Sequence, residues 1–325
     1  MQSMHPSEVL FQGRQRPLAL PVCDHYAGAE ARMRKSISMQ QAMGPVFDIT
    51  LDCEDGAAAG KEAWHARLIA GIIAGDENRF GRVGVRVHDA GSDHFESDVE
   101  IVCRAARKLA YIVIPKADSV ETLRKAVDLV NHHAAKVGRT GLPVHALIET
   151  HGALAAVRSF AALPQVECLS FGIMDFVSEH FGAIPASAMR SPGQFTHPLV
   201  TRAKLEIAAA CHAHGKIPSH NVTTEIRETS VVANDAARAA NEFGYTRMWS
   251  IHPDQILPII AAFLPNATEV DEAVSILRAA EVAHWGPIQH NGRLHDRASY
   301  RYYWMVLQRA RSSGLVLPEA ATGLL

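Results

Sequence analysis

The sequence has no marked excess of charge of either sign and no long hydrophobic run. Its 32 Lys and Arg residues nearly balance 34 Asp and Glu residues, so the formal net charge is −2. So small a charge excludes a general attraction to nucleic acid or to anionic membranes. No apolar stretch approaches the roughly 20 residues that a membrane-spanning helix requires. We therefore expect neither nucleic acid nor a membrane as a partner, and any phosphate-bearing ligand must be held by a local basic cluster.

Cysteine is scarce, and its pattern excludes a disulfide framework. The five cysteines are odd in number and widely spaced, and no two form a Cys-x-x-Cys pair. This usage is typical of reduced thiols in the cytoplasm, which is the expected location. Motifs of several enzyme classes are also missing. There is no His-Glu-x-x-His zinc motif despite 18 histidines, no phosphate-binding P-loop and no serine-nucleophile elbow.

Short apolar runs alternate with longer stretches of helical periodicity. Most of the runs are apolar throughout, which is typical of parallel strands buried on both faces. Eight such units within about 260 residues predict a TIM (β/α)8 barrel. A doubly wound open sheet is the alternative, but no Gly-x-Gly-x-x-Gly follows any run, which disfavours a dinucleotide-binding fold. The expected strands are Leu18–Cys23, Phe47–Cys53, Val83–His88, Tyr111–Lys116, Val144–Thr150, Cys168–Met174, Lys216–Asn221 and Met248–His252.

The stretches between the runs carry signals of helix ends. Asp118 and Glu121 have the spacing of a capping box. The segment from Pro198 to His214 is expected to be helical and to end at Gly215, a typical C-terminal cap. Beyond residue 265 only helical patterns follow, at Glu269–Ala283 and Asp296–Arg311.

Three parts of the chain follow from these patterns. Residues 1–16 are polar, lack the layout of a secretory signal, and are expected to form an N-terminal tail. Residues 8–13, EVLFQG, resemble a protease site used in expression tags, so this stretch is either native or a tag remnant. Residues 17–265 are the expected barrel, and residues 266–325 the expected C-terminal helical extension or lid.

Acidic residues follow two neighbouring expected strands. Glu149 and Asp175 each come after an apolar run, and a TIM barrel places its chemistry at the C-terminal ends of its strands. Two carboxylates with no thiol or imidazole set nearby suit a hard divalent cation, which takes further ligands from water and substrate. Mg²⁺ fits best, and Mn²⁺ is not distinguished from it. The alternative is a buried acid pair neutralised by Arg86 and by backbone amides.

Asp52, Glu54 and Asp55 cluster at the end of another expected strand. Asp55 suits the N-cap of the next helix, but capping needs only one acid, which leaves Asp52 and Glu54 as functional candidates. Arg86 is a charged residue in an otherwise apolar strand. It neutralises Glu54, clamps a substrate carboxylate through two hydrogen bonds, or does both. Lys116 is either a Schiff-base nucleophile or, as we favour, a partner in an ion pair at the barrel mouth.

Taken in order, six motifs resemble the citrate lyase β-subunit-like branch of the HpcH/HpaI aldolase family. The resemblance covers roughly residues 16 to 310, and the set in register is far more specific than any single motif. It implies a TIM barrel with a C-terminal helical segment, assembled as a trimer or hexamer. The matching motifs are Leu51–Asp55, Val85–His88, Ile114–Lys116, Ala146–Thr150, Phe171–Asp175 and Ser250–Pro253.

The resemblance also implies roles for the acidic and basic candidates. Glu149 and Asp175 resemble Mg²⁺ ligands. Arg86 resembles the arginine that holds the carboxyl end of the substrate and stabilises the enolate. Asp52 and Glu54 resemble acids that support this arginine and the waters of the metal.

Two further predictions concern residues outside these strand ends. Asp296 falls where relatives have a catalytic aspartate, which in several of them comes from a neighbouring subunit, although its flanking residues differ from the usual pattern. Arg32, Arg34 and Lys35 suit the phosphates of coenzyme A, or else form a solvated helix face. With Arg86 and Lys116, Arg34 and Lys35 are the expected substrate-binding residues.

We therefore expect a Mg²⁺-dependent carbon–carbon lyase, with coenzyme A as part of its substrate. The substrate would be a carboxylated 3-hydroxyacyl-CoA such as citryl-, malyl- or citramalyl-CoA, and cleavage would pass through an acyl-CoA enolate. Two alternatives stay open. One is a CoA-independent metal aldolase that yields pyruvate and an aldehyde. The other is a non-catalytic barrel subunit of a lyase complex. Several loops depart from the family pattern, so the use of CoA is also open.

Overall fold

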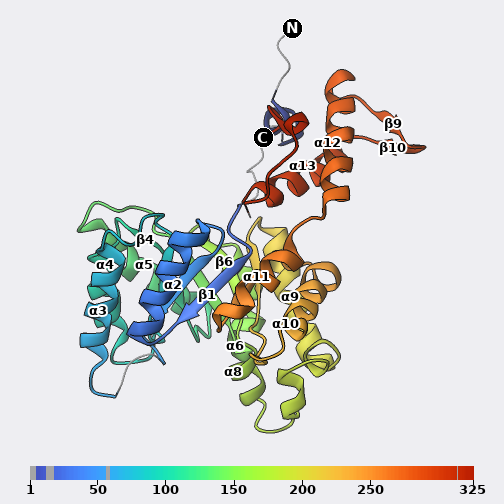
Figure 1. Ribbon diagram of the computed structural model, residues 1–325. Helices are drawn as coiled ribbons and strands as arrows, with labels where there is room; N and C mark the ends of the chain where they lie inside the picture. The colour runs from blue at the N-terminus through green and yellow to red at the C-terminus, as the bar shows by residue number, and fades with distance from the viewer. Residues whose placement is uncertain (1–4, 12–17, 56–58, 313) are drawn as a thin grey trace. The chain divides into compact units, whose positions relative to one another are not determined.

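The computed structural model describes residues 5–11, 18–55, 59–312 and 314–325. The chain separates into two compact units (Figure 1). The larger unit, Pro21–Phe263, contains the barrel, and the smaller one combines Met1–Leu20 with Leu264–Leu325.

Eight parallel strands close into a barrel in the larger unit. They follow one another in sequence order, and β8 pairs back with β1. The closed barrel confirms the predicted TIM fold and excludes the open doubly wound sheet. The strands are β1 (Cys23–Ala27), β2 (Asp48–Asp52), β3 (Val83–Arg86), β4 (Leu109–Ile114), β5 (Val144–Ile148), β6 (Val166–Phe171), β7 (Ile217–His220) and β8 (Arg247–Ser250).

Helices alternate with these strands and lie around their outside (Figure 1). The N-cap of α5 differs from the prediction: the side chain of Ser119, and not Asp118, accepts the backbone N–H of Thr122 at 3.1 Å. The helices are α2 (Glu30–Met43), α3 (Glu62–Ala74), α4 (Phe95–Cys103), α5 (Val120–Ala135), α6 (His151–Ala155), α7 (Val157–Ala161), α8 (Ile173–Ser178), α9 (Pro198–Ala213), α10 (Thr229–Phe243) and α11 (Pro253–Phe263), with two 3-10 turns, η1 (Ala186–Met189) and η2 (Gly193–Phe195).

The prediction for the first strand was wrong. The apolar run Leu18–Cys23 precedes β1, which begins only at Cys23 and continues through polar residues. These polar residues can be buried because residues far away in the sequence form hydrogen bonds and ion pairs with them. Asp24 Oδ2 lies 3.0 Å from Arg247 Nη2, and His25 Nδ1 lies 2.7 Å from Ser250 Oγ. Since both partners are on β8, the local pattern gives no sign of this strand.

Aromatic packing fills the barrel below its C-terminal end. Tyr111 of β4 is buried with Leu147 and Trp249 in one cluster drawn from three strands. A Cβ on Gly84 of β3 would lie 2.2 Å from the Tyr111 ring, so the ring occupies the space of the missing side chain. The hydroxyl of Tyr111 donates to Asp24 Oδ1 at 3.0 Å. The Tyr111 ring is thereby held against Leu147 and Trp249 in the barrel interior.

The smaller unit has a hydrophobic core of its own, to which α12 (Ala267–Val282), α13 (Arg297–Ser312) and α1 (Pro6–Phe11) contribute. The rings of Phe11 and Trp304 meet edge to face at 5.3 Å. Two predictions differ from this arrangement. Residues 6–11 of the expected tail are helical and packed, and an antiparallel pair, β9 (Ile288–His290) and β10 (Arg293–His295), interrupts the expected run of helices. A short 3-10 turn, η3, follows near the C-terminus at Glu319–Ala321.

Two expected absences can be checked in the part of the chain that the structure describes. No helix there is long and apolar enough to cross a membrane. All five cysteines are free and buried.

Candidate active site

A cavity of about 240 Å³ lies at the C-terminal ends of the barrel strands. It brings together three of the residues predicted from the sequence, Arg86, Glu149 and Asp175. Its other lining residues come from the ends of β1, β5, β6 and β8, from the start of α8, and from the loops that follow β2, β6, β7 and β8: Tyr26, Asp55, Leu147, Phe171, Gly172, Ile173, Met174, Asn221, Val222, Trp249 and Ile251.

The two carboxylates expected to bind metal differ in their surroundings. Glu149 follows β5 directly and is 2% exposed, and its Oε1 accepts the backbone N–H of Lys116 at 3.0 Å. Burial, and then the charge of Asp175, raise the pKa of Glu149 to about 8. Asp175 lies in the first turn of α8, and its side chain is 47% exposed. One of these carboxylates is thus fixed inside the protein, and the other faces solvent.

Arg86 is surrounded by acids from the end of β2. Its Nε and Nη2 donate to the two oxygens of Asp52 at 2.8 and 3.1 Å, and its Nη1 lies 2.9 Å from Glu54 Oε2. Its Nη2 also donates to Asp55 Oδ2 at 2.8 Å, although Asp55 is 72% exposed. Burial alone would raise the pKa of Asp52, but the Arg86 guanidinium holds it below its usual value. Asp52 therefore orients Arg86, whereas Asp55 is its most exposed partner.

Lys116 was interpreted either as a Schiff-base nucleophile or as a partner in an ion pair, and its geometry agrees with the ion pair. Its Nζ lies 2.7 Å from Glu54 Oε1 and 3.8 Å from Asp175 Oδ1. Burial lowers the pKa of Lys116, but the hydrogen bond that Lys116 donates to Glu54, together with the negative charges of the surrounding acids, outweighs this and raises the pKa to about 12. A Schiff-base nucleophile needs the opposite shift. The backbone of Lys116 is left-handed (φ 49°), a conformation that is enriched at functional sites.

The residues of this site fit a divalent cation. Among the described residues no three His, Cys, Asp or Glu side chains converge on a metal position, so an ion would have two protein ligands and take the rest from water and substrate. Mg²⁺ is bound in that way. The surroundings are also short of positive charge, because five carboxylates face two cationic groups. These are Asp52, Glu54, Asp55, Glu149 and Asp175 against Arg86 and Lys116.

Gly172 leaves the space that Glu149 occupies. A Cβ at this position would lie 2.3 Å from Glu149 Oε2 and 2.6 Å from Glu149 Cβ. Gly172→Ala must therefore displace the carboxylate, and we expect it to weaken Mg²⁺ binding by about 10- to 100-fold, as losses of ligand orientation do. Isothermal titration calorimetry with MgCl₂ measures this.

Gly71→Ala in α3 is the matched control, because no atom lies within 4 Å of a Cβ at that position. We expect unchanged Mg²⁺ affinity and a stability gain of about 0.5–1 kcal/mol, since Ala is the better helix former. Equal Mg²⁺ affinity in the two variants would contradict the role given to Gly172.

The raised pKa of Glu149 predicts a dependence of stability on pH. Between its usual value of 4.5 and about 8, the native metal-free protein holds a proton that the unfolded chain has released. Stability therefore falls as pH rises through this window. Melting temperatures from pH 5 to 8 should decline more steeply for the metal-free wild type than for Glu149→Gln, and Mg²⁺ should restore most of the loss at pH 8. If the melting temperatures of the two proteins declined in parallel with pH, the raised pKa of Glu149 would be refuted.

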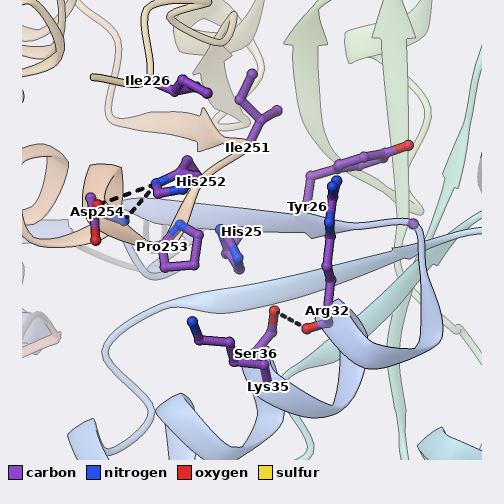
Figure 2. Close-up of a pocket in the computed structure, with 11 residues that line it drawn as sticks. His25, Tyr26, Arg32, Lys35, Ser36, Ile226, Ile251, His252, Pro253 and Asp254 are labelled. Atoms are coloured by element: carbon purple, nitrogen blue, oxygen red, sulfur yellow. Dashed lines mark hydrogen bonds and ion pairs between the residues drawn. The ribbon is translucent and has the colours of Figure 1, made fainter. Parts of the chain in front are cut away.

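A larger pocket of about 660 Å³ adjoins the cavity, and Tyr26 and Ile251 line both. Figure 2 shows Arg32 and Lys35 of α2 along one side and His252 on the other. The structure thus brings together two of the three cations predicted for coenzyme A.

Arg34 and Asp296 have other surroundings. Arg34 pairs with Glu30 at 2.9 Å and with Glu77 at 3.8 Å and does not line this pocket, so its role in substrate binding stays a prediction. Asp296 belongs to the smaller unit, where its exposed carboxylate accepts the backbone N–H of Ala298 at 2.9 Å and caps α13. Its catalytic role stays a prediction.

Tyr26, Asn221 and Trp249 line the cavity and were not predicted from the sequence. Tyr26 donates a hydrogen bond to Asp52, and its ring stacks on Trp249 with centroids 6.2 Å apart. Only a correct placement of β1 and β8 could have identified this pair.

Comparisons with known proteins agree with this architecture. Residues 27–253 match the HpcH/HpaI aldolase/citrate lyase family. An L-malyl-CoA/β-methylmalyl-CoA lyase from Cereibacter sphaeroides is 28% identical over 293 residues, which cover 85% of this chain and 91% of that protein. The crystal structure of a citrate lyase from Burkholderia xenovorans LB400 has 58% identity and a TM-score of 0.87, and the match covers 99% of this chain and 100% of that one.

A more distant structure agrees in fold. Protein CitE from Mycobacterium tuberculosis, in complex with magnesium, acetoacetate and coenzyme A, is 20% identical with a TM-score of 0.68, over 90% of this chain and 99% of that one. The family match extends over most of the chain and over the strands that carry the acidic cavity, and it confirms the predicted enzyme class. The chain therefore belongs to the HpcH/HpaI aldolase/citrate lyase family of carbon–carbon lyases.

Proposed function

We propose that this protein is a Mg²⁺-dependent lyase that cleaves a carboxylated 3-hydroxyacyl-CoA of the citryl-, malyl- or citramalyl-CoA type. One observation carries the proposal: an acidic cavity suited to a divalent cation adjoins a basic pocket large enough for an extended phosphate-bearing group. The malyl-CoA lyase relative, and the CitE structure that holds magnesium and coenzyme A, support this choice of substrate.

The residues of the cavity would have different roles in this reaction. Glu149 and Asp175 would hold the ion, which supplies Lewis-acid polarisation of the substrate oxygens. Arg86, oriented by Asp52, binds the substrate carboxylate in place of Asp55 and fixes the reacting half. As the carbon–carbon bond breaks, the 3-hydroxyl loses its proton and the electron pair passes to the acyl-CoA enolate.

Two acids are candidates for the base that takes this proton. Glu54 lies within the site, where it contacts Arg86 and Lys116. Asp296 of a neighbouring subunit is the other candidate, and it requires the homo-oligomer that the sequence predicts.

Arg32 and Lys35 would bind the phosphates of coenzyme A. We expect Arg32→Ala and Lys35→Ala each to raise the KM for the CoA thioester about tenfold, which corresponds to roughly 1.4 kcal/mol, and to leave kcat unchanged, because they hold a part of the substrate remote from the reaction. Arg34→Ala is the matched control, since Arg34 pairs with Glu30 on the same helix. An equal KM in all three variants would remove this pocket from the proposal.

Incubation with a panel of CoA thioesters and free 2-oxoacids, with and without Mg²⁺, tests the function as a whole. Mass spectrometry should detect Mg²⁺-dependent formation of an acyl-CoA and an oxoacid or aldehyde. Turnover of CoA-free substrates alone would instead establish an aldolase that yields pyruvate. Absence of turnover with the entire panel would favour a non-catalytic subunit.

A further inference from the structure

A buried polar network borders the catalytic cavity on the side of β7 and has no part in the mechanism above. It joins η2, α9, the end of β7 and α10, and each of its main members is at most 2% exposed. These members are Gln194, Lys204, His220, Asn221 and Asp235.

The carboxylate at one end of the network fixes the orientation of the amides. Asp235 has acceptor atoms only, and the hydroxyls of Ser191 and Thr223 also donate to it. Gln194 must therefore direct its Nε2 to Asp235 Oδ2, at 2.8 Å. Its Oε1 then faces the other way and accepts from Lys204 Nζ at 3.0 Å and from Asn221 Nδ2 at 2.9 Å.

The same chain of donors and acceptors orients Asn221. Its Nδ2 donates to Gln194 Oε1 and, at 2.8 Å, to the carbonyl of Val222, so both amide hydrogens are used. The remaining polar atom, Oδ1, is buried and has no partner among the described residues. Buried acceptors are seldom left unpaired in native proteins. Asn221 also lines the catalytic cavity, so a slight opening around Oδ1 would let a donor carried by the ligand become its partner.

We propose that Asn221 Oδ1 accepts a hydrogen bond from the hydroxyl of the bound substrate before this hydroxyl turns to the base that takes its proton, and that Lys204 is a positioning residue that holds Asn221 in this orientation through Gln194. The inference rests on the proposed function, in which a hydroxyacid is cleaved to an oxoacid. A hydroxyl can donate to Asn221, whereas a keto oxygen cannot. The side chain therefore distinguishes substrate from product.

Calorimetric titration of the full chain in MgCl₂ with L-malate and with fresh oxaloacetate tests this, because the two acids differ only in the hydroxyl or keto group. Asn221→Leu should raise the Kd for malate about tenfold, the loss expected for one hydrogen bond, and leave that for oxaloacetate within about twofold. Lys204→Met keeps the contact with Phe195 and should give the same selective loss. Asn131→Leu, which removes an amide pair with Gln165 outside the cavity, should change neither Kd.

The outcomes separate this inference from the proposed function. Wild-type protein that binds neither acid in a Mg²⁺-dependent manner overturns the inference, whereas the proposed function is decided by turnover of the CoA thioesters. Wild-type binding with equal losses for the two acids in Asn221→Leu, or with no loss, overturns the inference alone, since a purely structural role does not discriminate between them. If Asn221→Leu does not fold by circular dichroism, the selectivity of Lys204→Met decides.

Discussion

Glu149→Gln and Asp175→Asn should each reduce Mg²⁺-dependent turnover by more than about a thousandfold in a protein that remains folded. The loss corresponds to the several kcal/mol that a metal ion contributes to transition-state stabilisation. Glutamine retains the oxygen that accepts the Lys116 N–H, so the change removes charge and little else. Steady-state kinetics over a Mg²⁺ series, together with calorimetric Mg²⁺ titration, measures both effects.

Glu179→Gln is the matched control for these variants. Glu179 is an acid that directly follows α8, and its Oε2 accepts the backbone N–H of His151 at 3.3 Å. We expect normal Mg²⁺ binding and turnover from this control. If Glu149→Gln and Asp175→Asn behaved like it, the assignment of the metal ligands would be wrong.

Arg86→Lys should lower kcat/KM by about 100- to 1000-fold, the second largest effect that we expect. An ammonium group cannot reproduce the two parallel hydrogen bonds of a guanidinium. Three carboxylates, those of Asp52, Glu54 and Asp55, would compete for one point charge, and buried Asp52 would lose part of its hydrogen bonding. The melting temperature should therefore fall together with activity.

Arg82→Lys separates this effect from a general cost of replacing arginine. Arg82 is 38% exposed and lies 3.9 Å from Asp48, a looser pair than any that Arg86 forms. The control should keep its activity and its melting temperature. Near-normal kcat/KM in Arg86→Lys would remove Arg86 from the mechanism.

The sequence predicts the barrel well because buried parallel strands leave an apolar signature. It fails at β1, where Asp24 and His25 are polar and become acceptable inside the barrel only through partners on β8. The antiparallel pair β9–β10 is similarly hidden, since three-residue strands are too short to show a period.

The same contrast holds for the candidate site: residues with a local sequence signal could be predicted, and residues that depend on distant partners could not. Glu149 and Asp175 stand out because each ends an apolar run, and both line one cavity. For the cations of α2, helical spacing already separates Arg34 from Arg32 and Lys35, which are three residues apart and share a face. Asn221 could not be predicted, because its role depends on amides and a lysine brought to it by other elements.

The missing side chain of Gly84 affects the packing inside the barrel. The Tyr111 ring fills that space. The cluster that it forms with Leu147 and Trp249 therefore depends on the absence of a side chain at this position of β3. Any larger residue at Gly84 would have to displace this ring, which packs with two residues that line the catalytic cavity, Leu147 and Trp249. We therefore expect the depth of the catalytic cavity to depend partly on Gly84, a position that does not line it.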